Sequence, residues 1–214
     1  MRRGTLSLLL GAHQVVLHPI CVTLAWHRIH ETWPAWDEAI AILVHDWGYL
    51  GCQSMDGLDG ERHPEMGAKI AGKVVGWFGG EERGLQAEAL VRGHSRTYAR
   101  IVGMSPSKLM APDKLALCYV PSWIYVPGAR LTGEMAEYRD NCTAYYERTG
   151  DGVPRTASDW KWFSWVCDYM ERAAQGKANL VTDRSYSATS ASSTVERDEE
   201  FTTKNTKDTK DRTS

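Results

Sequence analysis

Apolar residues recur three and four positions apart along most of the chain, and the alternation typical of β-strands is scarce. This spacing predicts helices at residues 18–30, 34–46, 63–80, 81–92, 112–117, 132–148 and 158–174. Prolines beside His18 and His63 suit the first turn of a helix, and glycines follow several of the segments. We therefore predict an all-α bundle with an irregular loop at residues 48–62.

The chain changes character after about residue 176. Its 214 residues are enough for one well-buried core, and we assign residues 1–176 to a single domain. Residues 185–214 are dominated by Ser, Thr, Asp, Lys and Arg, with Phe201 almost their only large apolar residue. Such a segment cannot bury enough surface to offset its ordering entropy. We therefore expect residues 177–214 to form a disordered low-complexity tail.

Charge and composition narrow the function classes. The formal net charge is −2 and the isoelectric point lies near 6.4, so no basic field favours duplex nucleic acid or an anionic membrane. No run approaches the ~20 apolar residues that span a bilayer, and the short apolar stretch at residues 6–12 lacks a convincing signal-peptide cleavage site. Scattered cysteines without a CxxC pair argue against a disulfide framework or zinc ribbon. We expect a cytoplasmic protein.

The adjacent His45 and Asp46 are the most informative pair. They follow an uncharged apolar run at residues 39–44 that should be buried, so their polar groups must be satisfied internally or bind a cation. Neighbouring residues on a helix point about 100° apart, and Gly48 permits a turn that would let both grip one ion. The alternative is a buried His–Asp hydrogen bond that caps the helix.

Other residues of the types that ligate first-row metals are spread along the chain. They are His18, His63, His94 and Asp113. His18 lies at the end of the apolar stripe of its helix and should face the core. His27 is nine residues further on, which places it on the opposite helix face. For His13, His27 and His30 we favour solvated surface.

Each of the candidate residues also has an ordinary interpretation. His63 begins a helix, where free N–H groups could meet a phosphate, but a histidine in an acidic surface loop would look the same. His94 follows a helix end, and Asp113 could simply cap its helix. Arg96 and Lys114 could neutralise a phosphate, although charged residues on helices are usually solvated. Only the complete set favours a metal centre.

With these residues assembled, the chain resembles the HD superfamily of metal-dependent phosphohydrolases. The family pattern is a histidine on a helix, then an adjacent His-Asp pair, then a distant aspartate, which converge inside a helical bundle. His18, His45, Asp46 and Asp113 match this pattern in order, and the similarity covers about residues 18–117. The resemblance implies an HD-domain bundle for the fold.

The resemblance also suggests how many ions the domain holds. Members with two metals place further histidines between the His-Asp pair and the last aspartate. His63 and His94 occupy that interval and would serve a second ion, with Asp46 bridging. The chain departs from the Gly-Tyr-Pro signature of some members, because Leu50 stands where the proline would be. This departure argues against hydrolysis of cyclic di-GMP.

By resemblance, the chain is a metal-dependent phosphohydrolase that uses one or two divalent ions (Mn, Fe, Co, Ni, Zn or Mg). Its substrate would be a nucleotide or another small phosphate ester or anhydride, attacked by water that the metal activates. Asp46 would orient the water, His63 or His94 could protonate the leaving oxygen if not ligating, and Arg96 and Lys114 would bind phosphate. Two alternatives stay open: a di-iron oxygenase with the same six ligands, and a non-catalytic ligand-binding module.

Overall fold

The computed structural model describes residues 2–53, 55 and 58–174 of the chain. These residues belong to one compact unit, Met1–Asn179, and no strand occurs among them. The predicted all-α bundle is therefore confirmed. The tail predicted at residues 177–214 lies outside the described residues.

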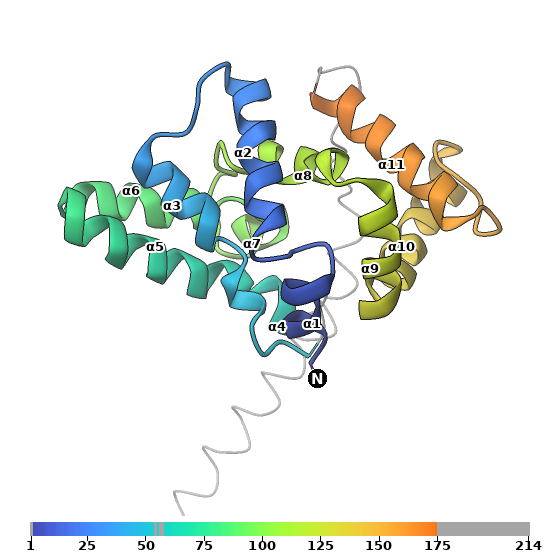
Figure 1. Ribbon diagram of the computed structural model, residues 1–214, viewed down its shortest axis with the longest axis horizontal. Helices are drawn as coiled ribbons and strands as arrows, with labels where there is room; N and C mark the ends of the chain where they lie inside the picture. The colour runs from blue at the N-terminus through green and yellow to red at the C-terminus, as the bar shows by residue number, and fades with distance from the viewer. Residues whose placement is uncertain (1, 54, 56–57, 175–214) are drawn as a thin grey trace, which may run out of the picture. The chain divides into compact units, whose positions relative to one another are not determined.

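The helices are connected mostly by short loops. In chain order they are α1 (Arg3–Leu10), α2 (Leu17–His30), α3 (Trp36–Val44), α4 (Leu58–Glu61), α5 (His63–Gly79), α6 (Glu81–Arg92), α7 (Arg96–Ile101), α8 (Met110–Ala116), α9 (Ser122–Thr132), α10 (Glu134–Thr149) and α11 (Asp159–Ala174), with 3-10 turns η1 (Trp47–Tyr49) and η2 (Leu117–Tyr119) (Figure 1). The helices predicted at 18–30, 63–80, 81–92 and 158–174 agree with α2, α5, α6 and α11 to within one residue.

Four helices, α1, α4, α7 and α9, were not predicted, and the reason differs between them. α1 and α7 are too short to show a helical period in the sequence. α9 contains Pro127 in its interior, a position where the missing N–H and the ring usually break a helix. The loop predicted at residues 48–62 likewise contains η1 and the single turn α4.

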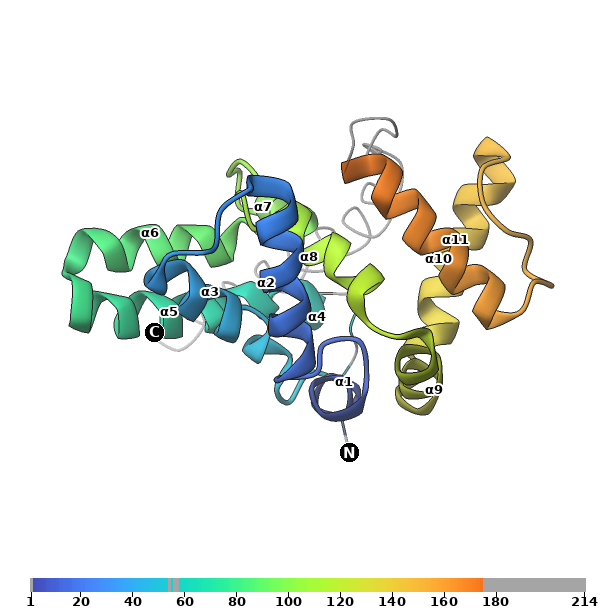
Figure 2. The same ribbon diagram turned by 45° about the horizontal axis from the view of Figure 1, so that its top comes forward.

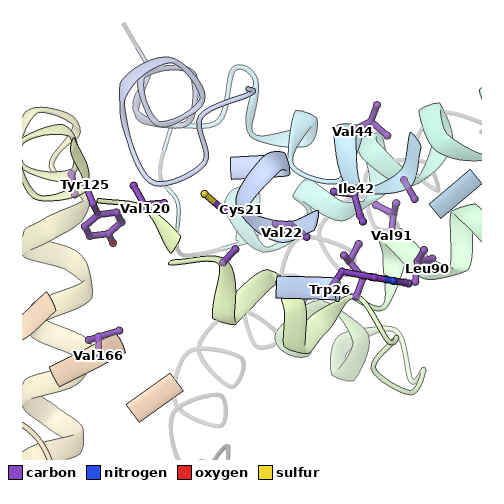
Figure 3. Close-up of a cluster of buried hydrophobic side chains, with 14 of the residues drawn as sticks. Cys21, Val22, Trp26, Ile42, Val44, Leu90, Val91, Val120, Tyr125 and Val166 are labelled. Atoms are coloured by element: carbon purple, nitrogen blue, oxygen red, sulfur yellow. The ribbon is translucent and has the colours of Figure 1, made fainter. Parts of the chain in front are cut away.

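The core is continuous across two groups of helices. α5 and α6 lie side by side and pack against α3, while α9, α10 and α11 pack on the other side of α2 and α8 (Figure 1, Figure 2). Buried side chains run from Trp26 and Leu90 at one end of the core, through Val22, to Tyr125 and Val166 at the other (Figure 3). Full burial of an aliphatic or aromatic side chain contributes about 1.5–3 kcal/mol. This core fixes the helix ends on which the candidate site is built.

Two observations concern the expectations about membrane spans and cysteines. None of the described helices combines the length and the apolarity needed to cross a membrane. The five cysteines, Cys21, Cys52, Cys118, Cys142 and Cys167, all have free thiols, in agreement with the prediction that they form no disulfide framework.

Candidate metal centre

Six buried histidine and aspartate side chains converge where several helix ends meet. They come from the first turn of α2 (His18), the residues after α3 (His45 and Asp46), the start of α5 (His63), the loop after α6 (His94) and the middle of α8 (Asp113). Each is at most 7% exposed. Ionisable groups buried this deeply need opposite charges or a cation as partners.

Four of the six side chains form a first group. The Nε2 atom of His18 lies 3.2 Å from Nε2 of His45 and 3.1 Å from Oδ1 of Asp113. The Oδ2 atom of Asp46 lies 3.3 Å from Nε2 of His18 and 3.1 Å from Nε2 of His45. The donor atoms of this group all lie within 4.8 Å of one another.

The second group shares Asp46 with the first. The Nε2 atoms of His63 and His94 lie 3.0 Å apart, and each is 3.5 Å from Oδ1 of Asp46. One carboxylate therefore turns one oxygen toward each group. This is the arrangement expected of a ligand that bridges two ions.

Three of the imidazoles are oriented by the helix end that precedes them. Nδ1 of His45 lies 2.7 Å from the carbonyl oxygen of Ile42, and Nδ1 of His63 lies 2.7 Å from that of Gly60. Nδ1 of His94 lies 2.6 Å from the carbonyl oxygen of Val91. A carbonyl oxygen only accepts hydrogen bonds, so Nδ1 carries the hydrogen and Nε2 of the neutral ring presents its lone pair. Each carbonyl is three residues earlier, at a helix end that leaves it without an intrahelical partner.

This orientation makes the second group difficult to satisfy without a cation. Two neutral imidazoles that both present Nε2 lone pairs across 3.0 Å repel each other. A cation between them removes that repulsion, and a backbone carbonyl on the far ring nitrogen is the usual support for a metal-bound histidine.

The electrostatics of the cluster also favour positive charge. Burial opposes the imidazolium form of His45, but the charge of Asp46 and the hydrogen bond to Asp113 outweigh it and raise the pKa of His45 to about 10. Burial also opposes the two carboxylate anions, yet His45 beside Asp46 and Lys114 beside Asp113 hold both carboxyl pKa values well below the usual range. Burial and the neighbouring ring of His94 hold the pKa of His63 well below its usual value, so the His63 ring is neutral.

The donor set fits divalent transition metals. Two donor atoms bound to one ion at roughly 2.1 Å are about 3.0–3.4 Å apart, close to the 3.0–3.5 Å that separate neighbouring donors here. The Oδ2 atom of Asp46 is buried and makes no hydrogen bond of good geometry. Mixed imidazole and carboxylate donors suit Mn, Fe, Co, Ni or Zn. Each of the two groups could hold one ion.

The structure brings together all six residues predicted as ligands. Asp113 does not cap a helix, because α8 begins three residues earlier at Met110. Lys114 lies beside the first group, with Nζ 3.1 Å from Oδ2 of Asp113, and that carboxylate raises the pKa of Lys114. Arg96 is the first residue of α7. Its predicted role in binding phosphate stays a prediction.

A cavity of about 290 Å³ adjoins the first group. His18, Asp113 and Lys114 line one end of it together with His13. The rest of the wall comes mainly from α9 (Tyr125), α10 (Tyr138 and Cys142) and α11 (Trp162, Val166 and Met170). The cluster is thus accessible from a space with one polar end and one largely apolar end.

The interpretation of His13 as solvated surface is wrong. Its side chain is only 18% exposed, with Nδ1 3.0 Å from Oγ of Ser7 and 3.4 Å from Oε1 of Glu134. Its ring lies 4.8 Å from that of Tyr49, which stacks on His63 at 3.9 Å. No local pattern could have placed His13 here, because Glu134 is 121 residues away in sequence.

The other two histidines assigned to the surface differ from each other. His27 is exposed, as predicted, with its ring 4.3 Å from Trp33. His30 is half-buried, and its Nε2 lies 3.1 Å from the carbonyl oxygen of Lys108. Neither contributes a donor atom to the two groups.

Glu134 joins the N-terminal segment to the turn between α9 and α10. Its carboxylate is 1% exposed and accepts hydrogen bonds from Oγ of Ser7, from N of Ala12 at 3.0 Å and from Oγ1 of Thr132 at 2.8 Å. Burial opposes its charge, but these bonds and His13 outweigh burial and lower the pKa of Glu134 below 4.5. Glu134 therefore stabilises the fold as an anion.

Replacing Glu134 by Gln should lower the free energy of unfolding by about 1–3 kcal/mol at pH 7, because a buried charged acceptor is lost. A carboxyl whose pKa is lowered on folding stabilises above its usual value of 4.5, and this contribution is lost as the pH falls through the folded-state pKa. The difference from wild type should therefore shrink below pH 4.5, as measured by urea unfolding. Glu147→Gln on the exposed side of α10 is the control and should change little. A difference that is independent of pH would contradict this role.

Comparison with known proteins returns no match: no family model, no curated protein and no solved structure matches the chain. The fold and the site define the chain as an all-α protein with a buried His/Asp cluster that could hold metal ions. This description is compatible with an HD domain, and membership of that superfamily stays a prediction.

Proposed function

We propose that the chain is a metal-dependent phosphohydrolase that acts on a small phosphate ester or anhydride. The observation that carries the proposal is the division of six buried donors into two groups that share Asp46. Two neighbouring cations are the usual solution for stabilising both the attacking and the leaving oxygens of a phosphoryl group. Lys114 at the cavity end supplies a further positive charge for a phosphate oxygen.

The residues would have different roles according to their position in the cluster. A bound divalent ion supplies a Lewis acid that lowers the pKa of water and polarises a phosphoryl oxygen. His18, His45 and Asp113 would hold an ion in the first group, and His63 and His94 in the second. A role for His63 or His94 as the acid that protonates the leaving oxygen is less favoured, because Nδ1 of each ring already donates to a carbonyl and Nε2 faces the cluster.

Two further side chains would act on the substrate itself. The Asp46 carboxylate lies between the groups and would orient a water by accepting its hydrogen bond. Lys114 keeps its proton, because the neighbouring Asp113 carboxylate raises the pKa of Lys114, and would neutralise a phosphate oxygen. Burial of the cluster keeps bulk water away, which strengthens each of these interactions.

The test is metal reconstitution joined to a phosphate-release assay. The purified chain would be stripped with a chelator, loaded separately with Mn, Fe, Co, Ni, Zn or Mg, and analysed for metal content. We expect one or two ions per chain and metal-dependent release of phosphate from at least one member of a panel of nucleotides and organic phosphates. Absence of bound metal, or bound metal without any turnover, would contradict the proposal. An iron-loaded protein that consumes O2 without releasing phosphate would instead favour the oxygenase alternative.

A further inference from the structure

The cavity beside the first group is polar at one end only. His13, His18, Asp113 and Lys114 lie at the polar end. On α11, Trp162, Val166 and Met170 follow one another at intervals of four residues, so they form one face of the helix and line the apolar part. A ligand that fills this space must combine an anionic group with an apolar one.

The size of the cavity limits the apolar group. A cavity of about 150 Å³ lined by apolar side chains is enough for benzene, and pockets for drug-sized ligands start at about 300 Å³. The 290 Å³ measured here therefore suits a single ring with its anionic substituent.

The chemistry of the wall points the same way. Aromatic rings of Tyr125, Tyr138 and Trp162 offer edges and faces to a ligand ring, and the sulfur atoms of Cys142 and Met170 make favourable contacts with aromatic groups. This part of the wall therefore offers a ligand mainly aromatic and sulfur contacts.

We propose that this cavity is the subsite for the organic group of the substrate, and that the substrate is a monophosphate ester of a compact aromatic alcohol or phenol. The inference rests on the proposed function, since it places the phosphate at the metal cluster. The ring lies between α9, α10 and α11, and the phosphate lies beside Lys114. The subsite selects the substrate by its apolar group.

The test measures binding, so that it does not depend on turnover. Benzylphosphonate and methylphosphonate share the anionic group, resist phosphate-ester hydrolysis and differ only in the ring. Isothermal titration of the metal-loaded protein under anaerobic conditions should give about 10- to 100-fold tighter binding of benzylphosphonate, the effect of burying one ring. Equal affinities would overturn the subsite, and so would failure of both probes to bind.

Two variants assign the effect to the cavity. Val166→Phe fills the apolar part and should abolish most of the preference for benzylphosphonate, whereas Ser164→Phe adds the same ring on an exposed position of α11 and should preserve it. Met170→Ala enlarges the cavity and should improve the binding of naphthylmethylphosphonate relative to benzylphosphonate. This gain cannot arise from misfolding, so it keeps the test valid if Val166→Phe is poorly folded.

The outcomes separate this inference from the proposed function. Preference for benzylphosphonate that responds to Val166→Phe supports the subsite whether or not phosphate is released. Metal-dependent phosphate release with equal binding of the two phosphonates supports the hydrolase and overturns the aromatic subsite. In the substrate panel, the subsite predicts faster phosphate release from benzyl phosphate than from methyl phosphate.

Discussion

Replacing Asp46 by Asn is expected to reduce metal binding in both groups and to lower metal-dependent phosphate release by roughly 10³-fold or more. Its Oδ2 lies 3.3 Å from Nε2 of His18 and its Oδ1 lies 3.5 Å from Nε2 of His63, so one substitution removes negative charge from both groups. Changes to residues that merely support a ligand cost about 10- to 100-fold in metal affinity or activity. The loss of a shared ligand should cost more.

Metal analysis of single variants tests this reasoning more sharply than activity alone. His18→Ala should reduce occupancy of the first group and His94→Ala that of the second, whereas Asp46→Asn should reduce both. Asp140→Asn is the control, because this side chain is 61% exposed and pairs with Arg155 at the surface. Circular dichroism would establish that each variant is still helical. Full metal content and activity in Asp46→Asn would refute the shared-ligand model.

The candidate ligands could be predicted because their signals are local. His45 and Asp46 directly follow an apolar helical run, and His63 and His94 stand at helix ends. The orientation of these histidines is local too, because each Nδ1 meets a carbonyl three residues earlier. Residue type and position relative to a helix end were therefore enough to single out His45, Asp46, His63 and His94, whereas Asp113, in the middle of α8, was a candidate only as part of the assembled set.

Contacts between distant segments could not be predicted in the same way. The ring of His13 faces Glu134, 121 residues further along, and a polar residue near a chain terminus is more often exposed. The cavity wall is built from α9, α10 and α11, and α9 was not predicted because of Pro127.

Gly48 lies in the turn η1, as the sequence suggested, but its φ is not positive, so the turn itself does not require glycine. What requires glycine at this position is close approach of another backbone. A Cβ atom at Gly48 would lie 1.8 Å from the carbonyl oxygen of His63. Likewise, a Cβ at Gly67 would lie 2.5 Å from the carbonyl oxygens of both Val44 and His45. The end of α3 and the start of α5 therefore meet backbone to backbone at the cluster.

Gly67→Ala should consequently lower the free energy of unfolding by about 1–3 kcal/mol, the usual effect of overpacking. The displaced element would be the end of α3, which carries His45, so metal content should fall as well. Helix propensity alone predicts the opposite sign, because alanine in a helix interior is favoured over glycine by about 0.8–1 kcal/mol.

Gly76→Ala, on the same helix, separates these two effects. A Cβ at Gly76 would meet its nearest neighbour, Cα of Gly84, at an ordinary 3.8 Å, so propensity should dominate and the variant should be slightly more stable than wild type. Urea unfolding of both metal-free variants, followed by metal analysis, makes the comparison. If both substitutions stabilised the chain equally, the close contact between α3 and α5 would not be a requirement of the site. Suppose instead that Gly67→Ala lowers the free energy of unfolding and Gly76→Ala raises it. The close spacing of the α3 and α5 backbones, and not the intrinsic stability of α5, would then be what holds His45 and Asp46 against the second group.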